Sequence, residues 1–247
     1  MRQSLLTNFK KPKQVAILID PEKSQNEGQL KALIQKINSA LVDYIFIGGS
    51  TVTKFEFEFT IRCLKENALA PIVIFPGSNE QVSKKADGIL YLSLLSGRNP
   101  DFLIGHHVQS AQEISDSGIE VIPTAYLLID GGTHSSVAYV SQTTPIPRDK
   151  ISIAKNTALA GKLQGKQVCF LDAGSGAKEH VPEKMVVELK KLNIPIIVGG
   201  GITSMESISN LHLAGASIVV IGNKIETDID FLLDIKSYIS SNAQTVI

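Results

Sequence analysis

Glycine-rich turns that could hold an anion follow three apolar runs of the sequence, at Asp172–Gly176, Gly199–Ile202 and Gly222–Asn223. Glycine has no Cβ, so backbone amides in such turns can approach a phosphate closely, and the N-terminus of a following helix adds partial positive charge. One such turn carries little information, because tight turns require glycine in any case. Three at the ends of consecutive strands predict a phosphate site, and none continues as the Gly-Lys-Ser/Thr of a Walker loop.

Oxygen-bearing side chains follow the first two apolar runs. Asp20 lies in the segment Ile19–Lys23, and Ser50 follows Gly48–Gly49. A carboxylate and a hydroxyl suit Mg²⁺, which takes one or two protein oxygens and completes its shell with water and substrate phosphates. In the alternative interpretation, Asp20 only turns the chain before Pro21 and Ser50 only caps a helix. The metal interpretation predicts two anion-binding regions on opposite sides of one opening, one for a phosphate and one for a metal-chelated diphosphate.

Short apolar runs rich in β-branched residues alternate with stretches of helical spacing along the chain. Near-continuous hydrophobic runs are typical of parallel strands that are buried on both faces. The predicted strands are Val15–Asp20, Tyr44–Gly48, Pro71–Phe75, Gly88–Leu92, Ile119–Ala125, Gln167–Asp172, Pro195–Val198 and Ser217–Ile221. The predicted helices are Gly28–Ala40, Lys54–Asn67, Asn79–Lys85, Pro100–Ser117, Lys150–Leu163, Pro182–Leu192, Ser204–Ala214 and Asp228–Ser240.

This alternation, with no Pro/Ser-rich linker, predicts an α/β fold in which residues 1–247 form a single-domain (β/α)8 TIM barrel. In such a barrel the C-terminal strand ends meet at one face, where ligands bind. A doubly wound open sheet is the alternative, and the lack of Gly-x-Gly-x-x-Gly after the first run disfavours its dinucleotide-binding version. The segment Tyr126–Arg148 is long for a strand-to-helix loop, so we expect it to project over the ligand-binding face, with an idle insertion as the alternative.

The charge balance limits which partners the chain can attract. Lys and Arg number 24, as do Asp and Glu, so no overall charge gathers nucleic acid or anionic lipid, and a bound anion must be held by local geometry. With 43% hydrophobic residues, 19% charged residues and a mean hydropathy of +0.12, the chain of 247 residues is globular and not intrinsically disordered.

Cysteine usage and the start of the chain predict a cytoplasmic protein. Cys63 and Cys169 are too few for a disulfide framework and lack zinc-ligand spacing, so we expect reduced thiols. The segment 1–14 has no apolar core followed by a cleavage site, and no run of about 18 apolar residues occurs in the chain.

Seven segments of the chain, in order from Asp20 to Asn223, resemble the motifs of one known family. They are Leu18–Lys23, Phe46–Ser50, Pro123–Tyr126, Gln142–Pro147, Leu171–Ala177, Val198–Ile202 and Val220–Asn223. The family is that of the geranylgeranylglyceryl phosphate synthases, and the chain is more loosely similar to the bacterial heptaprenylglyceryl phosphate synthases. The resemblance covers nearly the whole chain.

The resemblance implies a modified TIM-barrel prenyltransferase that joins the 3-hydroxyl of sn-glycerol 1-phosphate to the allylic carbon of a prenyl diphosphate, by default geranylgeranyl diphosphate. Mg²⁺ is the implied cofactor, held by Asp20 and Ser50. The implied contacts of glycerol phosphate are Phe170, Asp172, Ala173, Gly174, Ser175, Gly176, Gly200, Gly201, Gly222 and Asn223. A homo-oligomer is expected, as is transient contact with the membrane surface, because the product is amphiphilic.

Asp172 is our candidate for the base that accepts the hydroxyl proton, and with Asp20 it makes up the predicted catalytic pair. The commoner family pattern is Tyr-Leu-Glu where this chain has Phe170-Leu171-Asp172. Phe170 cannot donate a hydrogen bond to glycerol phosphate, and Asp172 is one methylene shorter than glutamate. In the alternative interpretation Asp172 only orients its loop.

A prenyl chain needs an apolar groove, and the candidates to line it are Tyr91–Val108, Tyr126 and Tyr139, although core packing explains an isolated aromatic residue equally well. His106, His107 and His134 are not accompanied by other residues with metal-ligand spacing, so we expect them in solvent or on helix surfaces.

Two other functions compete with the synthase. A barrel-type phosphosugar isomerase would use Asp20 with Asp130, or Asp20 with Asp172, as acid and base, and would need no metal and no groove. The second competing function is a barrel that binds a phospholigand without catalysis. The departure from the family's Tyr-Leu-Glu pattern at Phe170 and Asp172 motivates this alternative.

Overall fold

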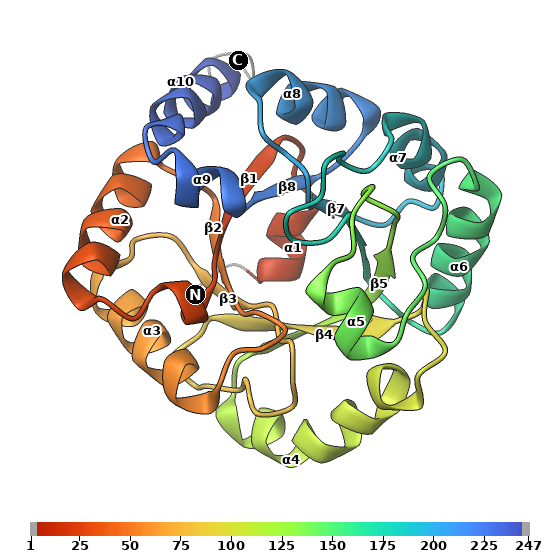
Figure 1. The fold of residues 1–247 in the computed structure, drawn as a ribbon, viewed down its shortest axis with the longest axis horizontal. Helices are drawn as coiled ribbons and strands as arrows, with labels where there is room; N and C mark the ends of the chain where they lie inside the picture. Colours follow the sequence, from red (N-terminus) through yellow and green to blue (C-terminus); the bar gives the residue numbers. More distant parts are fainter. Residues whose placement is uncertain (1–3, 244–247) are drawn as a thin grey trace.

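Eight parallel β-strands close into a barrel in the computed structural model, which describes residues 4–243 (Figure 1). The strands are β1 (Gln14–Ile19), β2 (Tyr44–Ile47), β3 (Ile72–Ile74), β4 (Gly88–Leu94), β5 (Glu120–Leu128), β6 (Val168–Asp172), β7 (Ile196–Gly199) and β8 (Ile218–Ile221). Each strand pairs with the next, and β1 pairs with β8 through Ala16 and Val220. The predicted (β/α)8 barrel is therefore confirmed, and the open doubly wound sheet is wrong.

Helices form a ring around the barrel (Figure 1). They are α2 (Glu27–Ala40), α3 (Lys54–Asn67), α4 (His106–Ser117), α6 (Ile151–Leu163), α7 (Glu183–Lys190), α8 (Met205–Ala214) and α10 (Phe231–Ala243), with the shorter α1 (Leu5–Phe9), α5 (Ser136–Ser141) and α9 (Asn223–Thr227). A 3-10 turn, η1 (Pro21–Lys23), follows β1, and a π-helical turn, η2 (Asp101–Gly105), leads into α4. The predicted helix Asp228–Ser240 is represented by α10, which starts three residues later, and α9 precedes it as a separate turn.

The strands alternate between the barrel interior and the helix layer. Ala16, Val73 and Phe170 belong to the cluster inside the barrel, whereas Val15 and Ile17 pack beneath the helices. Side chains two residues apart on a strand point the same way. The inward series through Ala16 therefore continues to Asp20, and the series through Phe170 continues to Asp172.

The connection between β3 and β4 contains no helix, so the predicted helix Asn79–Lys85 is wrong. Gln81, which is 1% exposed, crosses instead to the loop after β2: its Nε2 donates to the Gly49 carbonyl at 2.9 Å, and its Oε1 accepts from the Gly77 amide at 3.0 Å. Side-chain hydrogen bonds to the backbone compete with helix formation in this way. The outer ring consequently has no helix between α3 and α4.

Helix α1 closes the N-terminal end of the barrel and lies across the middle of the ring in Figure 1. Leu5 and Phe9 pack into the interior cluster, with the Phe9 ring 4.9 Å from that of Tyr44. The carboxylate of Glu120, at the start of β5, accepts hydrogen bonds from the Leu5 and Leu6 amides at 2.7 and 2.9 Å. The C-terminal end is therefore the end that remains open to ligands.

Within the part of the chain that the structure describes, no helix combines the length and the apolar character needed to cross a membrane. Cys63 and Cys169 are buried and unpaired, as expected for free thiols.

Candidate active site

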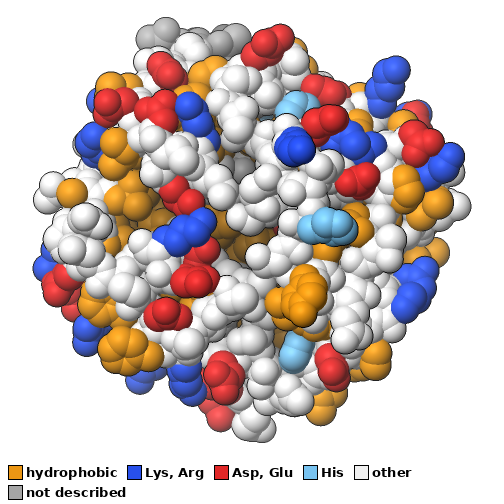
Figure 2. All heavy atoms as spheres, viewed as in Figure 1, with side chains coloured by type: hydrophobic (Ala, Val, Ile, Leu, Met, Phe, Trp, Pro, Cys, Tyr) orange, Lys and Arg blue, Asp and Glu red, His pale blue; other side chains and the backbone are white. Residues whose placement is uncertain are grey.

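A cavity of about 310 Å³ opens at the C-terminal ends of the strands. Figure 2 shows a hollow near the middle of this face, with apolar side chains inside it and charged side chains close to its rim. The predicted site residues that line it are Asp20, Ser50, Phe170, Asp172, Ser175, Gly176, Gly200, Gly201, Gly222 and Asn223. Ala173 and Gly174 do not line it, because they belong to the backbone turn behind Asp172.

The glycine-rich strand ends form one wall of the cavity. Gly200 has φ +81°, and a Cβ there would lie 2.7 Å from the Gly174 amide nitrogen and 2.8 Å from Asp172 Oδ1. A side chain at this position would be strained and would collide with the carboxylate. Among the described residues, the amides of Ser175, Gly176 and Gly201 donate no hydrogen bond to a protein group. These amides are therefore available to an anion.

Asp172 is buried at the end of β6, with 8% of its surface exposed. Its Oδ2 accepts a hydrogen bond from the Tyr126 hydroxyl at 2.6 Å, and its Oδ1 accepts one from the Gly174 amide at 2.8 Å. Burial raises the pKa of the Asp172 carboxyl, while the hydrogen bonds from Tyr126 and Gly174 act in the opposite direction. The pKa of Tyr126 is also raised, by its burial and by the neighbouring carboxylate, so the phenol remains a donor.

An aromatic slot holds Tyr126 in place. Phe75 and Phe170 stack with their centroids 4.8 Å apart and their planes at 2°, and the Tyr126 ring meets each of them edge-on at 5.7 Å. Phe170 is 1% exposed. It therefore supports the floor of the cavity through packing, in keeping with its lack of a hydrogen-bonding group.

The oxygen-bearing side chains predicted to hold a metal, Asp20 and Ser50, lie at the ends of β1 and β2. Asp20 Oδ1 accepts from the Glu22 amide at 3.1 Å, and burial raises the pKa of the Asp20 carboxyl. Gly49 allows the close approach of the second loop, because a Cβ there would lie 3.0 Å from Asp20 Oδ1. Ser50 follows directly and lines the same cavity.

The two anion-binding regions share a border, which corrects the prediction that they face each other from opposite sides. Because β1 pairs with β8, the loop of Asp20 adjoins α9, and Lys23 of η1 forms an ion pair with Glu226 of α9 at 2.7 Å. The regions nevertheless open into one cavity.

The donors near Asp20 fit Mg²⁺ better than a metal that binds through protein ligands alone. No cluster of three or more His, Cys, Asp or Glu side chains suited to a metal occurs in the described ranges. One carboxylate and one hydroxyl at the cavity wall match an ion that keeps several waters and binds substrate phosphates.

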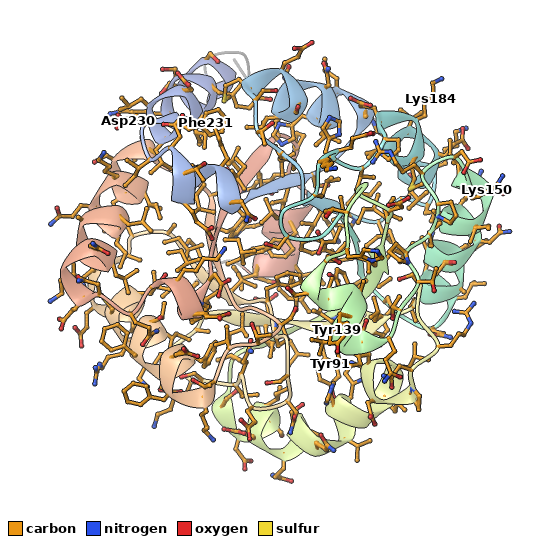
Figure 3. All side chains as sticks on the ribbon, viewed as in Figure 1. Tyr91, Tyr139, Lys150, Lys184, Asp230 and Phe231 are labelled. Carbon is orange, nitrogen blue, oxygen red and sulfur yellow. The ribbon has the colours of Figure 1, made fainter. Side chains whose placement is uncertain are left out.

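The cavity continues into an apolar region beside β4, beneath the gap between α3 and α4. Its lining there includes Val82, Ile89, Tyr91, Leu92, Phe102, Ile114 and Val137. Of the residues predicted for a groove, Tyr91 and Tyr126 line the cavity. Tyr139, labelled with Tyr91 in Figure 3, does not and is 87% exposed. No helix follows β3, so none covers this region between α3 and α4.

Two of the histidines are placed differently from the prediction. His107 is 7% exposed and packs its ring 4.3 Å from that of Tyr91, so a solvated position is wrong. Burial lowers the pKa of His107, which favours the neutral ring in an apolar wall. His106 also lines the cavity, whereas His134 is exposed as expected.

Comparison with known proteins identifies the family. The model of the PcrB family matches residues 8–238. The chain belongs to the PcrB family. A protein of Zunongwangia profunda named geranylgeranylglyceryl phosphate synthase is 48% identical over 87% of this chain and 91% of its own length. One of the same name from Pyrococcus furiosus is 40% identical over 85% of this chain and 84% of its own length. The resemblance found in the sequence is thus confirmed.

Solved structures have the same architecture as this PcrB-family chain. The (S)-3-O-geranylgeranylglyceryl phosphate synthase of Thermoplasma acidophilum, in complex with sn-glycerol-1-phosphate, superposes with a TM-score of 0.88 at 33% identity, covering 95% of this chain and 96% of its own. The enzyme of Thermoplasma volcanium gives 0.86 at 32% identity, covering 96% and 97%.

Asp130 lies outside the cavity of the PcrB-family chain. It is exposed, and its carboxylate accepts from the Gly132 amide at 2.9 Å. The acid–base pair of Asp20 with Asp130 is therefore wrong, whereas Asp20 and Asp172 do line one cavity.

Two residues of the PcrB-family site were missed as functional groups. Tyr126 was expected only as groove lining, yet its hydroxyl binds Asp172. The inward alternation of Thr124, Tyr126 and Leu128 could have placed it in the barrel. Gln81, which braces the loop of Ser50, had no signal in the sequence because it lies in an irregular segment.

Proposed function

We propose that this PcrB-family chain is a geranylgeranylglyceryl phosphate synthase. The 3-hydroxyl oxygen of sn-glycerol 1-phosphate forms a bond with C1 of geranylgeranyl diphosphate, the bond from C1 to the diphosphate oxygen breaks, and the hydroxyl proton passes to a base. The products are the prenyl ether and diphosphate. The names of the relatives and the bound ligand of the Thermoplasma acidophilum structure support this assignment.

The observation that carries the proposal is the continuity of the cavity. A single opening joins the glycine-rich ends of β6 to β8, the oxygens of Asp20 and Ser50, and the apolar region beside β4. Two anionic head groups and one hydrocarbon chain can therefore occupy adjoining parts of the same space. A phosphosugar isomerase would have no use for the apolar region.

The free amides at the ends of β6 and β7 bind the phosphate of glycerol phosphate in this proposal. Ser175 Oγ donates to Asn223 Oδ1 at 3.1 Å and so links the turn after β6 to the one after β8. This contact fixes the spacing of the two turns around a phosphate. Backbone amides supply the positive potential that a chain without excess Lys and Arg does not.

Asp172 accepts the hydroxyl proton. A carboxylate must be ionised to act as a base, so the rate rises with pH through the pKa of Asp172, which burial raises. Tyr126 and Gly174 hold both carboxylate oxygens and limit rotation of the side chain. Asp172 lines the cavity, so the remaining lone pairs can accept a proton from glycerol phosphate bound there.

Asp20 and Ser50 would hold Mg²⁺, which would neutralise charge on the diphosphate as it leaves. Gln81 and Gly49 fix the loop that carries Ser50, and Pro21 stiffens the turn after Asp20. These contacts orient the two oxygens before substrate arrives.

The apolar region beside β4 receives the prenyl chain. Phe75, Leu92 and Phe102 cover its inner part, and Val137 and Val140 of α5 cover the side nearest the long loop after β5. Exclusion of water there protects the allylic carbon from hydrolysis while it gains cationic character.

The direct test incubates the protein with sn-glycerol 1-phosphate, labelled geranylgeranyl diphosphate and Mg²⁺, with product analysis by mass spectrometry. Ether formed only with both substrates, and lost on chelation, supports the proposal. Binding of glycerol phosphate without turnover supports the non-catalytic barrel. Farnesyl and heptaprenyl diphosphates are compared in the same assay to define the chain length.

The proposal places the enzyme in the cytoplasm, in keeping with its two unpaired cysteines, and in transient contact with the membrane that receives its amphiphilic product. We also propose that the protein is a homo-oligomer. Exposed apolar side chains on outer helices, such as Leu163 and Leu213, support this proposal. Light scattering after size-exclusion chromatography tests the oligomeric state.

A further inference from the structure

A buried phenol and a buried carboxylate meet at the floor of the cavity. The Tyr126 hydroxyl lies 2.6 Å from Asp172 Oδ2, which is short for a hydrogen bond and typical of an ionised acceptor. Tyr126 is 4% exposed and Asp172 is 8% exposed, and both line the cavity. The contact joins two neighbouring strands, because Tyr126 is on β5 and Asp172 ends β6.

The phenol has little freedom to move away. Its ring lies edge-on against the stacked pair of Phe75 and Phe170 at 5.7 Å from each. Rotation about χ1 would drive the ring into side chains that are themselves packed in the barrel. The hydroxyl is therefore pre-positioned for Asp172 and does not depend on the substrate for its orientation.

We propose that Tyr126 is a positioning residue for Asp172: its hydroxyl fixes the Oδ2 atom, stabilises the ionised carboxylate and so aims the remaining lone pairs at the 3-hydroxyl of the acceptor alcohol. This inference deepens the proposed function and rests on it. With the Gly174 amide on Oδ1, the short aspartate side chain is held at both oxygens. The Tyr126 hydroxyl thus acts on Asp172 and does not replace the contact with glycerol phosphate that Phe170 cannot make.

The hydrogen bond from Tyr126 affects the pKa of Asp172, so its loss can be measured in the pH profile of the reaction. Burial, the Tyr126 hydroxyl and the Gly174 amide are the influences that act on the Asp172 carboxyl. The other titratable side chains of the cavity come from other elements and are Asp20, Glu22, Lys23, Tyr91, His106, His107, Lys224 and Glu226. Loss of the phenol hydroxyl removes a group that lowers the pKa of Asp172, so that pKa rises.

The test compares pH profiles of kcat/KM for the wild type and for Tyr126→Phe, with glycerol phosphate varied. The acidic limb is the part of the profile in which kcat/KM rises with pH as Asp172 ionises. In Tyr126→Phe we expect this limb to move to higher pH by about one unit, since a hydrogen bond to a charged group changes its pKa by about that much. The plateau of kcat falls about tenfold, while KM for glycerol phosphate changes less than about twofold, because a positioning residue affects the chemical step and not the binding of substrate. An acidic limb at the wild-type pH overturns the proposal.

Tyr44→Phe is the matched control. Tyr44 also lies inside the barrel, where its hydroxyl contacts the Gln14 side chain at 2.9 Å, but it is outside the cavity. The same change of atoms there leaves the acidic limb in place. An equal shift in both variants would mean that the limb reports general loosening of the barrel and would count against the proposal.

A double-mutant cycle separates positioning from direct contact with substrate. In an Asp172→Asn background, Tyr126→Phe has little further effect on kcat if Tyr126 acts through Asp172. A full further loss overturns the inference, because Tyr126 then acts on the substrate itself. Where Tyr126→Phe folds poorly, 3-fluorotyrosine at position 126, a stronger donor, moves the acidic limb to lower pH. A wild type that forms no ether contradicts the proposed function instead.

Discussion

The two cavity carboxylates have the same charge but different surroundings, and these surroundings separate their roles. Asp172 is held by a phenol and an amide at the end of β6, and burial raises its pKa. Asp20 is half-buried, with Lys23 Nζ 4.0 Å from its Oδ2. A carboxylate near the rim suits a hydrated ion, and a carboxylate at the floor suits a proton transfer.

Asp20→Asn tests the role of the rim carboxylate. Asparagine keeps an oxygen that can accept from the Glu22 amide, so we expect normal folding. If Asp20 holds Mg²⁺ as proposed, turnover falls at least about 100-fold, because the metal would no longer neutralise charge on the diphosphate as it leaves. Affinity for glycerol phosphate, measured by calorimetry without prenyl diphosphate, stays near the wild-type value. A parallel loss of turnover and of glycerol phosphate affinity would contradict this division of the cavity.

Gly200→Ala tests whether the close approach of β7 to Asp172 matters for catalysis. Its Cβ would lie 2.8 Å from Asp172 Oδ1, and φ is +81°. Gly165→Ala is the matched control, because its φ is +86° and nothing lies within 4 Å of the Cβ position. Gly165→Ala loses about 1 kcal/mol of folding stability from the backbone strain, and Gly200→Ala loses more, because its Cβ would also lie 2.7 Å from the Gly174 amide nitrogen.

Only Gly200→Ala displaces the carboxylate, so only this variant loses kcat, by about 100-fold. Steady-state assays and urea unfolding of the two alanine variants measure the difference. Equal activity in both variants would show that the contact with Asp172 is not needed.

At the level of elements, the strand ends were predictable and the irregular connections were not. Successive side chains of a strand point to opposite faces, which directs Asp172, the last residue of β6, and Asp20, the residue after β1, to the barrel interior, and this alternation is local to each strand. The segment Asn79–Lys85 contains Glu, Gln and Lys residues, which favour a helix in isolation. The tertiary hydrogen bonds of Gln81 to Gly49 and Gly77 override it, and a partner in another loop leaves no trace in local sequence.

Gln81→Leu tests the brace that replaces this helix. Leucine keeps the volume but leaves the Gly49 carbonyl and the Gly77 amide without their partner. The loop of Ser50 then loses its fixed position. If Ser50 holds Mg²⁺ as proposed, the Mg²⁺ concentration for half-maximal activity rises about tenfold, because residues that orient metal ligands affect metal affinity by about that factor.

The maximal rate of Gln81→Leu at saturating Mg²⁺ stays within about threefold of the wild type, since the proposed ligands Asp20 and Ser50 are themselves unchanged. Gln112→Leu is the control, because Gln112 is exposed on α4 and its side chain donates a hydrogen bond to Asp116 of the same helix, at 3.0 Å. An unchanged Mg²⁺ requirement in Gln81→Leu would show that this brace does not position the loop.

In the whole molecule, the two ends of the barrel have different roles: the open C-terminal end carries the candidate site, and the closed N-terminal end contributes to stability. The site lies at the C-terminal strand ends, whereas α1 fills the other end with Leu5 and Phe9. Eight buried runs and their spacing were enough to predict the barrel. They did not predict α1, because a helix of five residues gains its stability from contacts with β4 and β5, more than 80 residues away.

Glu120→Ala tests the closed end without touching the site. The Glu120 carboxylate accepts from Ser4 Oγ at 2.6 Å, from the Leu5 amide at 2.7 Å and from the Leu6 amide at 2.9 Å. Burial acts to raise the pKa of Glu120, but these hydrogen bonds outweigh it and the pKa is lowered from 4.5. The ionised form therefore stabilises the fold above pH 4.5, and this stabilisation is lost as the pH falls through the lowered value.

For Glu120→Ala we expect about 2 kcal/mol less stability at pH 7 and a Tm lower by about 4–8 °C, with kcat/KM unchanged. The stability difference from the wild type narrows below pH 4, where the wild-type carboxylate is protonated too. Glu113→Ala, on the exposed face of α4, is the control and leaves the Tm in place. Calorimetry and the prenyl transfer assay measure both properties on the same samples. A Glu120→Ala protein of wild-type stability would mean that burial of Leu5 and Phe9 alone holds α1 against the barrel, and a loss of kcat/KM would mean that the two ends of the barrel are coupled.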